Sequence, residues 1–258
     1  MPALGLGVYD MYKETAIQAV EDALSIGYRL IDTASMYDNE EEIGKAIRNS
    51  KVDRKEIFLT TKLNNTDHGY EAALNAFEAS LEKLNQDYVD LYLIHWPIKE
   101  GRTDSWLALE KLYAEKRVRA IGVANYNIAL LEELKSIAHI VPAVNQIEFS
   151  PWLFQEDLLN YCKKAGIQVQ SYSPITRGLK FSDARLDVLC KKYGKTPAQI
   201  VLNWHLQLGL STIPKSSNKA RLMENFEASH FSLLAEDIQI LNSFNENFRI
   251  CDDPQSYE

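Results

Sequence analysis

The feature that most constrains the fold is a repeated alternation of short apolar segments with longer segments of helical periodicity. Each apolar segment has the length of a strand, and a helical pattern follows it. This order favours parallel strand pairing, because every parallel connection needs a crossover whereas antiparallel hairpins do not. The expected strands are 3–8, 28–31, 57–61, 89–94, 118–123, 143–147, 167–172 and 210–213.

The helical segments show apolar residues on one face and ordinary termination signals. In the first of them, Ala16, Val20 and Leu24 share a face, and Gly27 is expected to end the helix as a left-handed cap. The expected helices are 13–25, 40–48, 70–84, 105–115, 127–138, 155–164, 184–193, 196–207, 219–225 and 235–244.

Eight such units in 258 residues predict an α/β fold of the (β/α)8 TIM-barrel type. We expect a single domain over residues 1–258, because no flexible linker interrupts the chain. The first strand is expected to begin without a preceding β-hairpin. An open doubly wound sheet is the alternative, but Gly5-Leu6-Gly7 is too short to be a dinucleotide-binding glycine sequence.

Charge and cysteine content narrow the classes of partner and compartment. Lys and Arg number 28 against 36 Asp and Glu, a net charge of −8, which argues against attraction to nucleic acid or anionic membrane. The three scattered cysteines indicate no disulfide framework, and no secretory signal or apolar run of about 20 residues is present. We therefore expect a cytoplasmic chain that binds neither nucleic acid nor membrane.

Four polar residues follow three consecutive expected strands. Asp32 and Tyr37 come after the second strand, Lys62 after the third and His95 after the fourth. Each alone has an ordinary explanation as a loop cap, a surface charge or a core residue. In a barrel, however, the carboxyl ends of the strands meet at one face, where active sites lie. The joint placement therefore predicts a catalytic cluster.

The chemistry of this cluster suits carbonyl reduction. A Tyr hydroxyl has a pKa of about 10, and an ammonium such as Lys62 is expected to lower it, with Asp32 keeping that lysine charged. His95 is expected to donate a hydrogen bond to the substrate oxygen. Tyr37 would then be the general acid. None of these groups supplies a hydride, so the reaction requires a nicotinamide cofactor.

Several short segments occur in a recognisable order along the chain. They are Leu4-Gly-Leu-Gly, Ile31-Asp-Thr-Ala-Ser-Met-Tyr, Thr61-Lys-Leu, Asp90-Leu-Tyr-Leu-Ile-His-Trp-Pro, Ile121-Gly-Val-Ala-Asn, Asn145-Gln-Ile-Glu, Ser171-Tyr-Ser-Pro and Ile213-Pro-Lys-Ser. From Leu4 to about Arg249 this order resembles the aldo-keto reductase family. The resemblance implies a triose-isomerase-type barrel, NADPH/NADP+ as cofactor, and a catalytic tetrad of Asp32, Tyr37, Lys62 and His95.

The resemblance also implies contacts to the nicotinamide, to the adenosine 2′-phosphate and to the adenine. From the residues alone, the preferred interpretation of the stretch 214–218 is a polar turn with a helix cap. The alternative is a phosphate site, because the stretch precedes an expected helix start. The implied cofactor positions are Asn125, Gln146 and Tyr172 for the nicotinamide, Lys215, Ser216, Ser217 and Asn218 for the phosphate, Arg221 for the phosphate and adenine, Glu224 and Asn225 for the adenine, and Ser173 for the cofactor in general.

Departures from the family pattern bear on the substrate. Ala124 replaces a usual Ser, while Tyr9 and Asn64 stand where Trp is frequent. With Trp96 they predict a partly aromatic, polar pocket for small oxygenated carbonyl compounds. The compact start of the chain and the segment Asn145-Gln-Ile-Glu-Phe-Ser-Pro most resemble bacterial B-type 2,5-diketo-D-gluconate reductases, which also reduce methylglyoxal-like aldehydes. We expect a monomer. The alternatives are a cofactor-binding relative with little turnover and a sugar-phosphate isomerase or aldolase on the same barrel.

Overall fold

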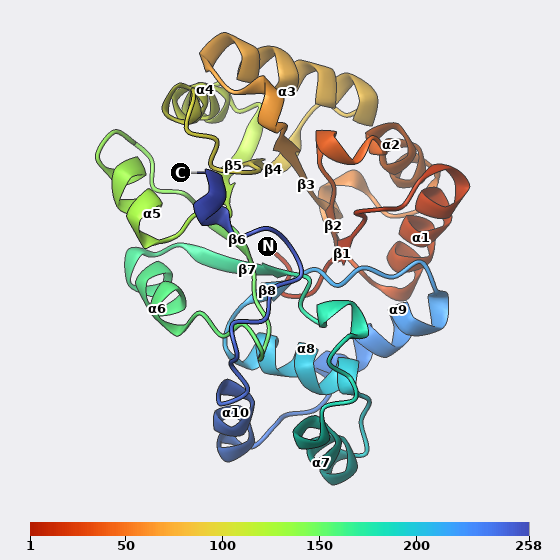
Figure 1. The fold of residues 1–258 in the computed structure, drawn as a ribbon. Coiled ribbons are helices and arrows are strands. Elements are labelled where there is room, and N and C mark those ends of the chain that lie inside the picture. Colours follow the sequence, from red (N-terminus) through yellow and green to blue (C-terminus); the bar gives the residue numbers. More distant parts are fainter. Residues whose placement is uncertain (258) are drawn as a thin grey trace.

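A computed structural model describes residues 1–257 and shows eight parallel strands in sequential order. The strands lie at the centre of Figure 1 and the helices surround them. The strands are β1 (Leu6–Gly7), β2 (Leu30–Asp32), β3 (Phe58–Leu63), β4 (Val89–Ile94), β5 (Val118–Ala124), β6 (Val144–Glu148), β7 (Gln168–Tyr172) and β8 (Ser211–Thr212).

The helices follow the strands as predicted, with boundary differences of a few residues. Gly27 ends α1 with φ of +125° and donates its N–H to Ala23. The helices are α1 (Lys13–Ile26), α2 (Glu40–Asn49), α3 (Tyr70–Leu84), α4 (Arg102–Ala114), α5 (Ile128–Lys135), α6 (Glu156–Ala165), α7 (Ala184–Tyr193), α8 (Pro197–Gln207), α9 (Lys219–Phe226) and α10 (Ala235–Asn242).

The sheet closes on itself between its first and last strands. Leu4 pairs in parallel with Thr212, and the Gly5 N–H donates to the Thr212 carbonyl at 2.9 Å. At Gly7 a Cβ atom would lie 2.8 Å from the Ile213 carbonyl oxygen, so this close approach requires glycine. The predicted barrel is therefore confirmed, and no hairpin precedes β1 within residues 1–257.

The two strands at this closure are shorter than predicted. The expected segments 3–8 and 210–213 contribute only Leu6–Gly7 and Ser211–Thr212 as regular strand. Pro214 has no N–H with which to continue the pairing beyond β8. Isolated backbone hydrogen bonds, such as Gly7 N–H to the Pro214 carbonyl at 3.3 Å, hold the remainder of the seam.

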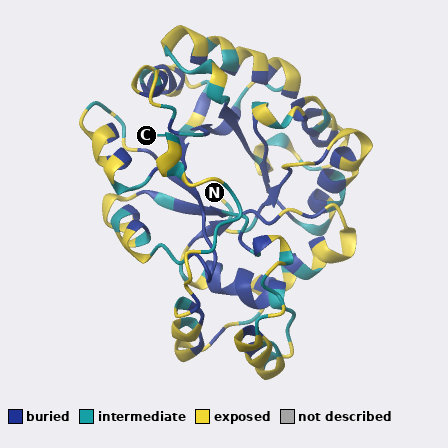
Figure 2. Ribbon diagram, in the orientation of Figure 1, coloured by how far each residue is buried: buried dark blue, intermediate teal, exposed yellow. Residues whose placement is uncertain are grey.

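The hydrophobic core lies mainly between the barrel and its helices. In Figure 2 the strands and the inward faces of the helices are buried, while the outward helix faces are exposed. A second, small apolar cluster consists of Leu91, Leu93, Ala124 and Val144, contributed by β4, β5 and β6. No helix within residues 1–257 has the length and apolarity needed to cross a membrane.

Candidate active site

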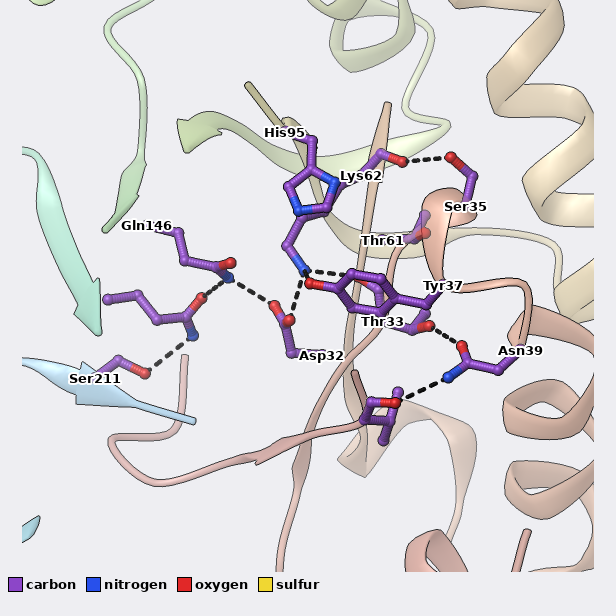
Figure 3. Close-up of polar contacts among 12 residues, drawn as sticks. Asp32, Thr33, Ser35, Tyr37, Asn39, Thr61, Lys62, His95, Gln146 and Ser211 are labelled. Carbon is purple, nitrogen blue, oxygen red and sulfur yellow. Dashed lines mark hydrogen bonds and ion pairs between the residues drawn. The ribbon is translucent and has the colours of Figure 1, made fainter. Parts of the chain in front are cut away.

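The four residues of the predicted tetrad lie together at the carboxyl ends of neighbouring strands (Figure 3). Asp32 is the last residue of β2, Lys62 lies near the end of β3, and His95 follows β4 directly. Tyr37 ends the short 3₁₀ helix η1 (Ser35–Tyr37) in the loop after β2. Parallel pairing of β2, β3 and β4 thus brings together side chains that are far apart in the sequence.

Lys62 is the centre of this cluster. Its Nζ atom lies 2.6 Å from Asp32 Oδ1, 2.9 Å from the Thr33 carbonyl oxygen and 3.3 Å from the Tyr37 hydroxyl. The side chain is completely buried. A lysine ammonium has three hydrogens to donate, and each therefore has an acceptor here. This arrangement holds a buried positive charge in one orientation beside the phenol.

The charge states of the buried pair follow from two opposed effects. Burial alone lowers the pKa of Lys62, but the charge of Asp32 and the contacts with Asp32 and Tyr37 outweigh it, so this pKa is raised. Burial raises the pKa of Asp32, while Lys62 and a hydrogen bond from Gln146 act in the opposite direction. Lys62 is accordingly protonated at neutral pH.

The expected lowering of the Tyr37 pKa by Lys62 is wrong as a net effect. Lys62 does act to lower it, but burial is the larger influence, and the pKa of Tyr37 is raised above its usual value of 10.0. In this structure the phenol therefore keeps its proton at neutral pH. A protonated phenol is the form that can donate to a substrate oxygen.

His95 is a neutral imidazole beside Tyr37. Burial, and secondarily the charge of Lys62, lower its pKa well below 6.5. The His95 and Tyr37 rings have centroids 5.5 Å apart and an interplanar angle of 74°. The amide of Asn125 donates to the His95 carbonyl oxygen at 2.9 Å and so holds this residue's backbone in place. A neutral imidazole still offers one N–H donor.

Asn39 positions the loop that carries Tyr37, a role that the sequence did not reveal. It is completely buried, accepts from the Thr33 hydroxyl at 2.6 Å, and donates to the carbonyls of Val8 and Met11 at 2.9 and 3.0 Å. Its position before α2 suggests a helix cap, but its side chain makes no cap hydrogen bond. Two of its partners, Val8 and Met11, lie in the connection after β1, about thirty positions earlier, which local sequence cannot show.

Three expected nicotinamide residues lie on the next three strands: Asn125 directly after β5, Gln146 within β6 and Tyr172 at the end of β7. The Tyr172 hydroxyl donates to Asn125 Oδ1 at 2.8 Å, and the Asn125 N–H donates to the Gln146 carbonyl at 2.9 Å. Gln146 Nε2 donates to Asp32 Oδ2 at 2.7 Å. Ser173 follows Tyr172 with a left-handed backbone, φ +47°. The expected cofactor side of the site is thus joined directly to the tetrad.

The expected phosphate residues gather at the start of α9. Asn218 caps this helix by accepting from the Arg221 N–H at 3.1 Å, and Ser216 Oγ accepts from the Asn218 N–H at 3.2 Å. Lys215 and Arg221 are exposed, and neither forms an ion pair within residues 1–257. Two free cations and a helix N-terminus fit a phosphate dianion. The residues present therefore suit the cofactor that the sequence predicted.

The two expected adenine residues are already part of the fold around α9. Glu224 Oε1 accepts from the Thr196 hydroxyl at 2.7 Å, so one of its carboxylate oxygens is bonded to the cap of α8. Asn225 is buried. Their contacts with an adenine remain predictions.

The expected pocket residues differ in how close they lie to the tetrad. The ring of Tyr9 is 5.1 Å from that of Tyr37 and is 53% exposed, while the Trp96 ring is 6.4 Å from that of His95. Asn64 accepts from the Asn65 N–H and caps η3 (Asn65–Asp67). Tyr9 and Trp96 therefore border the tetrad, whereas the observed contact of Asn64 is within its own loop.

The C-terminal segment also reaches the site, through a residue that sequence reasoning missed. Glu148, at the end of β6, accepts hydrogen bonds from the backbone N–H groups of Ile250 at 2.6 Å and Cys251 at 3.0 Å. Further along, the ring of Tyr257 lies 4.8 Å from that of Trp96. In the sequence Glu148 stood only as the residue after the expected strand 143–147, and its partners lie about a hundred positions later.

Comparisons with known proteins agree with this geometry. Residues 3–246 match the model of the aldo/keto reductase family. The chain is 46% identical over 255 residues to a glyoxal reductase of Bacillus subtilis, covering 98% of this chain and 92% of that protein.

Solved structures lead to the same group of proteins. An aldo-keto reductase from a deep-sea metagenome library has a TM-score of 0.96 at 43% identity, covering 98% of this chain and 94% of its own. A variant of the protein Gox0644 in complex with NADPH has a TM-score of 0.94 at 40% identity, covering 99% of this chain and 94% of its own.

Proposed function

Because the chain belongs to the aldo/keto reductase family and is an NADP-dependent oxidoreductase, we propose that it reduces small oxygenated aldehydes and ketones with Tyr37 as general acid. The bound NADPH supplies the hydride for such a reaction. The side chains supply binding, orientation and the proton.

One observation carries the proposal: the Tyr37 hydroxyl lies 3.3 Å from the Nζ atom of a buried, charged Lys62. The phenol holds its proton in the resting site, because burial raises its pKa. When the proton leaves, the adjacent ammonium stabilises the phenolate that remains. The lysine therefore assists the transfer without itself losing a proton.

The neighbouring residues define where the substrate oxygen is held. A carbonyl oxygen placed between Tyr37 and His95 would accept a hydrogen bond from the phenol and a second from the neutral imidazole. Asp32 holds the ammonium from the opposite side at 2.6 Å. Two donors at one oxygen favour the negative charge that develops there during reduction.

Aromatic side chains border the place where the substrate would bind. Tyr9 and Trp96 provide aromatic walls beside the tetrad, and Tyr257 packs against Trp96. The similarity to a glyoxal reductase supports a short oxygenated aldehyde. We propose methylglyoxal-like aldehydes and diketo sugar acids as the substrate class. We further propose that the chain is a single domain, is cytoplasmic and is a monomer. Light scattering on the purified chain would test the monomeric state.

The deciding experiment compares the wild type with Tyr37→Phe. NADPH oxidation with methylglyoxal should fall on the order of 10²–10⁴-fold, the usual contribution of a general acid. NADPH binding should change little, and Tyr113→Phe on the exposed face of α4 should keep full activity. Undiminished turnover by Tyr37→Phe would contradict the assignment. Carbonyl conversion without NADPH would favour an isomerase or aldolase instead.

A further inference from the structure

A row of hydrogen-bonded side chains crosses the inside of the barrel behind Asp32. Gln146 Nε2 donates to Gln170 Oε1 at 2.7 Å, Gln170 Nε2 donates to Ser211 Oγ at 3.2 Å, and Ser211 Oγ donates to the Pro2 carbonyl at 3.1 Å. Figure 3 shows Gln146 bonded to Asp32 on one side and joined on the other through the row to Ser211. Its members are register partners on β6, β7 and β8.

The two ends of the row determine the direction of every hydrogen bond in it. The Pro2 carbonyl can only accept, and so can the Asp32 carboxylate that meets Gln146 at the opposite end. Because Ser211 gives its hydrogen to Pro2, its oxygen accepts from the Gln170 amide nitrogen. The Gln170 amide oxygen therefore faces Gln146, and only a nitrogen of Gln146 can meet it.

This direction leaves Gln146 one orientation. Its Nε2 atom donates to Asp32 Oδ2 and to Gln170 Oε1, both at 2.7 Å, so both amide hydrogens are engaged. The Oε1 atom of Gln146 is therefore the atom of this amide that can accept a hydrogen bond from a cofactor. Turning the amide over would set its oxygen against two acceptors, Asp32 and Gln170, in a buried site.

We propose that Gln170 is a positioning residue, which acts through Gln146 to hold that amide with its nitrogen on Asp32 and its oxygen toward the nicotinamide carboxamide. The inference rests on the proposed function, since it assumes that the cofactor lies against Gln146. Gln170 is completely buried, and along the hydrogen-bonded path three side chains, those of Gln146, Asp32 and Lys62, separate it from Tyr37. It would thus affect cofactor binding without touching the cofactor.

The test compares Gln170→Met with Gln168→Met. Methionine keeps the length of the side chain but removes the amide. Gln168 lies two residues earlier on β7, and its amide donates to the carbonyls of Val169 and Gly209 rather than to Gln146. By NADPH fluorescence titration of folded protein, Gln170→Met should raise the Kd about tenfold, the effect of one strong hydrogen bond. Gln168→Met should leave the Kd within about twofold.

A double-mutant cycle tests whether Gln170 acts through Gln146. If it does, Gln146→Met combined with Gln170→Met should bind NADPH no more weakly than Gln146→Met alone. Additive losses of NADPH affinity in the double variant, or an unchanged Kd in Gln170→Met, would overturn this inference. Neither result would contradict the proposed carbonyl reduction. A wild type that neither binds NADPH nor reduces carbonyl compounds would overturn the proposed function, and this inference with it.

Discussion

The Nζ atom of Lys62 lies 2.6 Å from Oδ1 of Asp32, and both side chains are buried at the carboxyl ends of adjacent strands. The second oxygen of Asp32 accepts from Gln146 at 2.7 Å. The carboxylate is therefore held from two sides of the barrel. Through Lys62 it is also linked to the hydroxyl of Tyr37.

Asp32→Asn should both destabilise and inactivate the protein. The substitution leaves a buried ammonium without its countercharge, which costs about 3–5 kcal/mol in the free energy of unfolding. It also removes the charge that raises the pKa of Lys62. Urea denaturation and NADPH oxidation measure the two effects. Asp104→Asn, at an exposed position of α4, is the control, and equal stability of the two variants would contradict the expected pairing energy.

Carbonyl reduction should not lose activity as the pH falls through 6.5. A histidine donates one hydrogen bond in its neutral form above its pKa, and the pKa of His95 lies well below 6.5 because of burial and the charge of Lys62. The neutral form therefore persists below the usual titration range. Initial rates between about pH 8 and pH 5.5 test the rate, and an NMR titration that showed the His95 ring gaining a proton near 6.5 would contradict the lowered pKa.

Glu148→Gln should loosen the C-terminal segment over the site. The carboxylate accepts from two backbone N–H groups, whereas an amide has one oxygen and would set its NH₂ group against one of them. Hydrogen exchange at Ile250 and Cys251 should become about tenfold faster. The KM for the carbonyl substrate should rise while kcat changes little. Glu71→Gln, at an exposed position of α3, should change neither the hydrogen exchange nor the KM. Unchanged exchange at Ile250 in Glu148→Gln would contradict the role of Glu148 in holding the C-terminal segment.

Removing the free cations at the start of α9 should reduce the preference for NADPH over NADH. Lys215→Ala together with Arg221→Ala should weaken NADPH binding about tenfold to a hundredfold through the lost charge-assisted hydrogen bonds, with NADH little affected. Lys219→Ala is the matched control, because that lysine is on the same helix but is paired with Asp22 at 2.7 Å. If the double variant lost equal affinity for NADPH and NADH, these two cations would not be the residues that bind the 2′-phosphate.

Local periodicity was sufficient for most of the fold. The helix Tyr70–Leu84 and the strand Val89–Ile94 have the bounds that the sequence predicted, because their patterns are long and uninterrupted. The strands at the barrel closure were predicted too long. Their extent depends on pairing between Leu4 and Thr212, which lie at opposite ends of the chain.

The site was predictable where a residue's place after a strand was enough to locate it. Asp32, Lys62 and His95 meet because parallel strands bring their carboxyl ends together, and Tyr37 follows from the first of these strands. Asn39, Glu148 and Gln170 were missed. Their partners come from the connection after β1, from distant strands or from the C-terminal segment, and nothing in the local sequence marks such contacts.

The sequence by itself determined the barrel, the family and the four side chains that carry the proposed chemistry, because strand order and residue type suffice for these. The tertiary structure decided the direction of the Tyr37 pKa, since burial outweighs the charge of Lys62 and only the folded chain shows how deeply the phenol lies. It also decided the orientation of Gln146, which follows from a row of partners that ends at the Pro2 carbonyl.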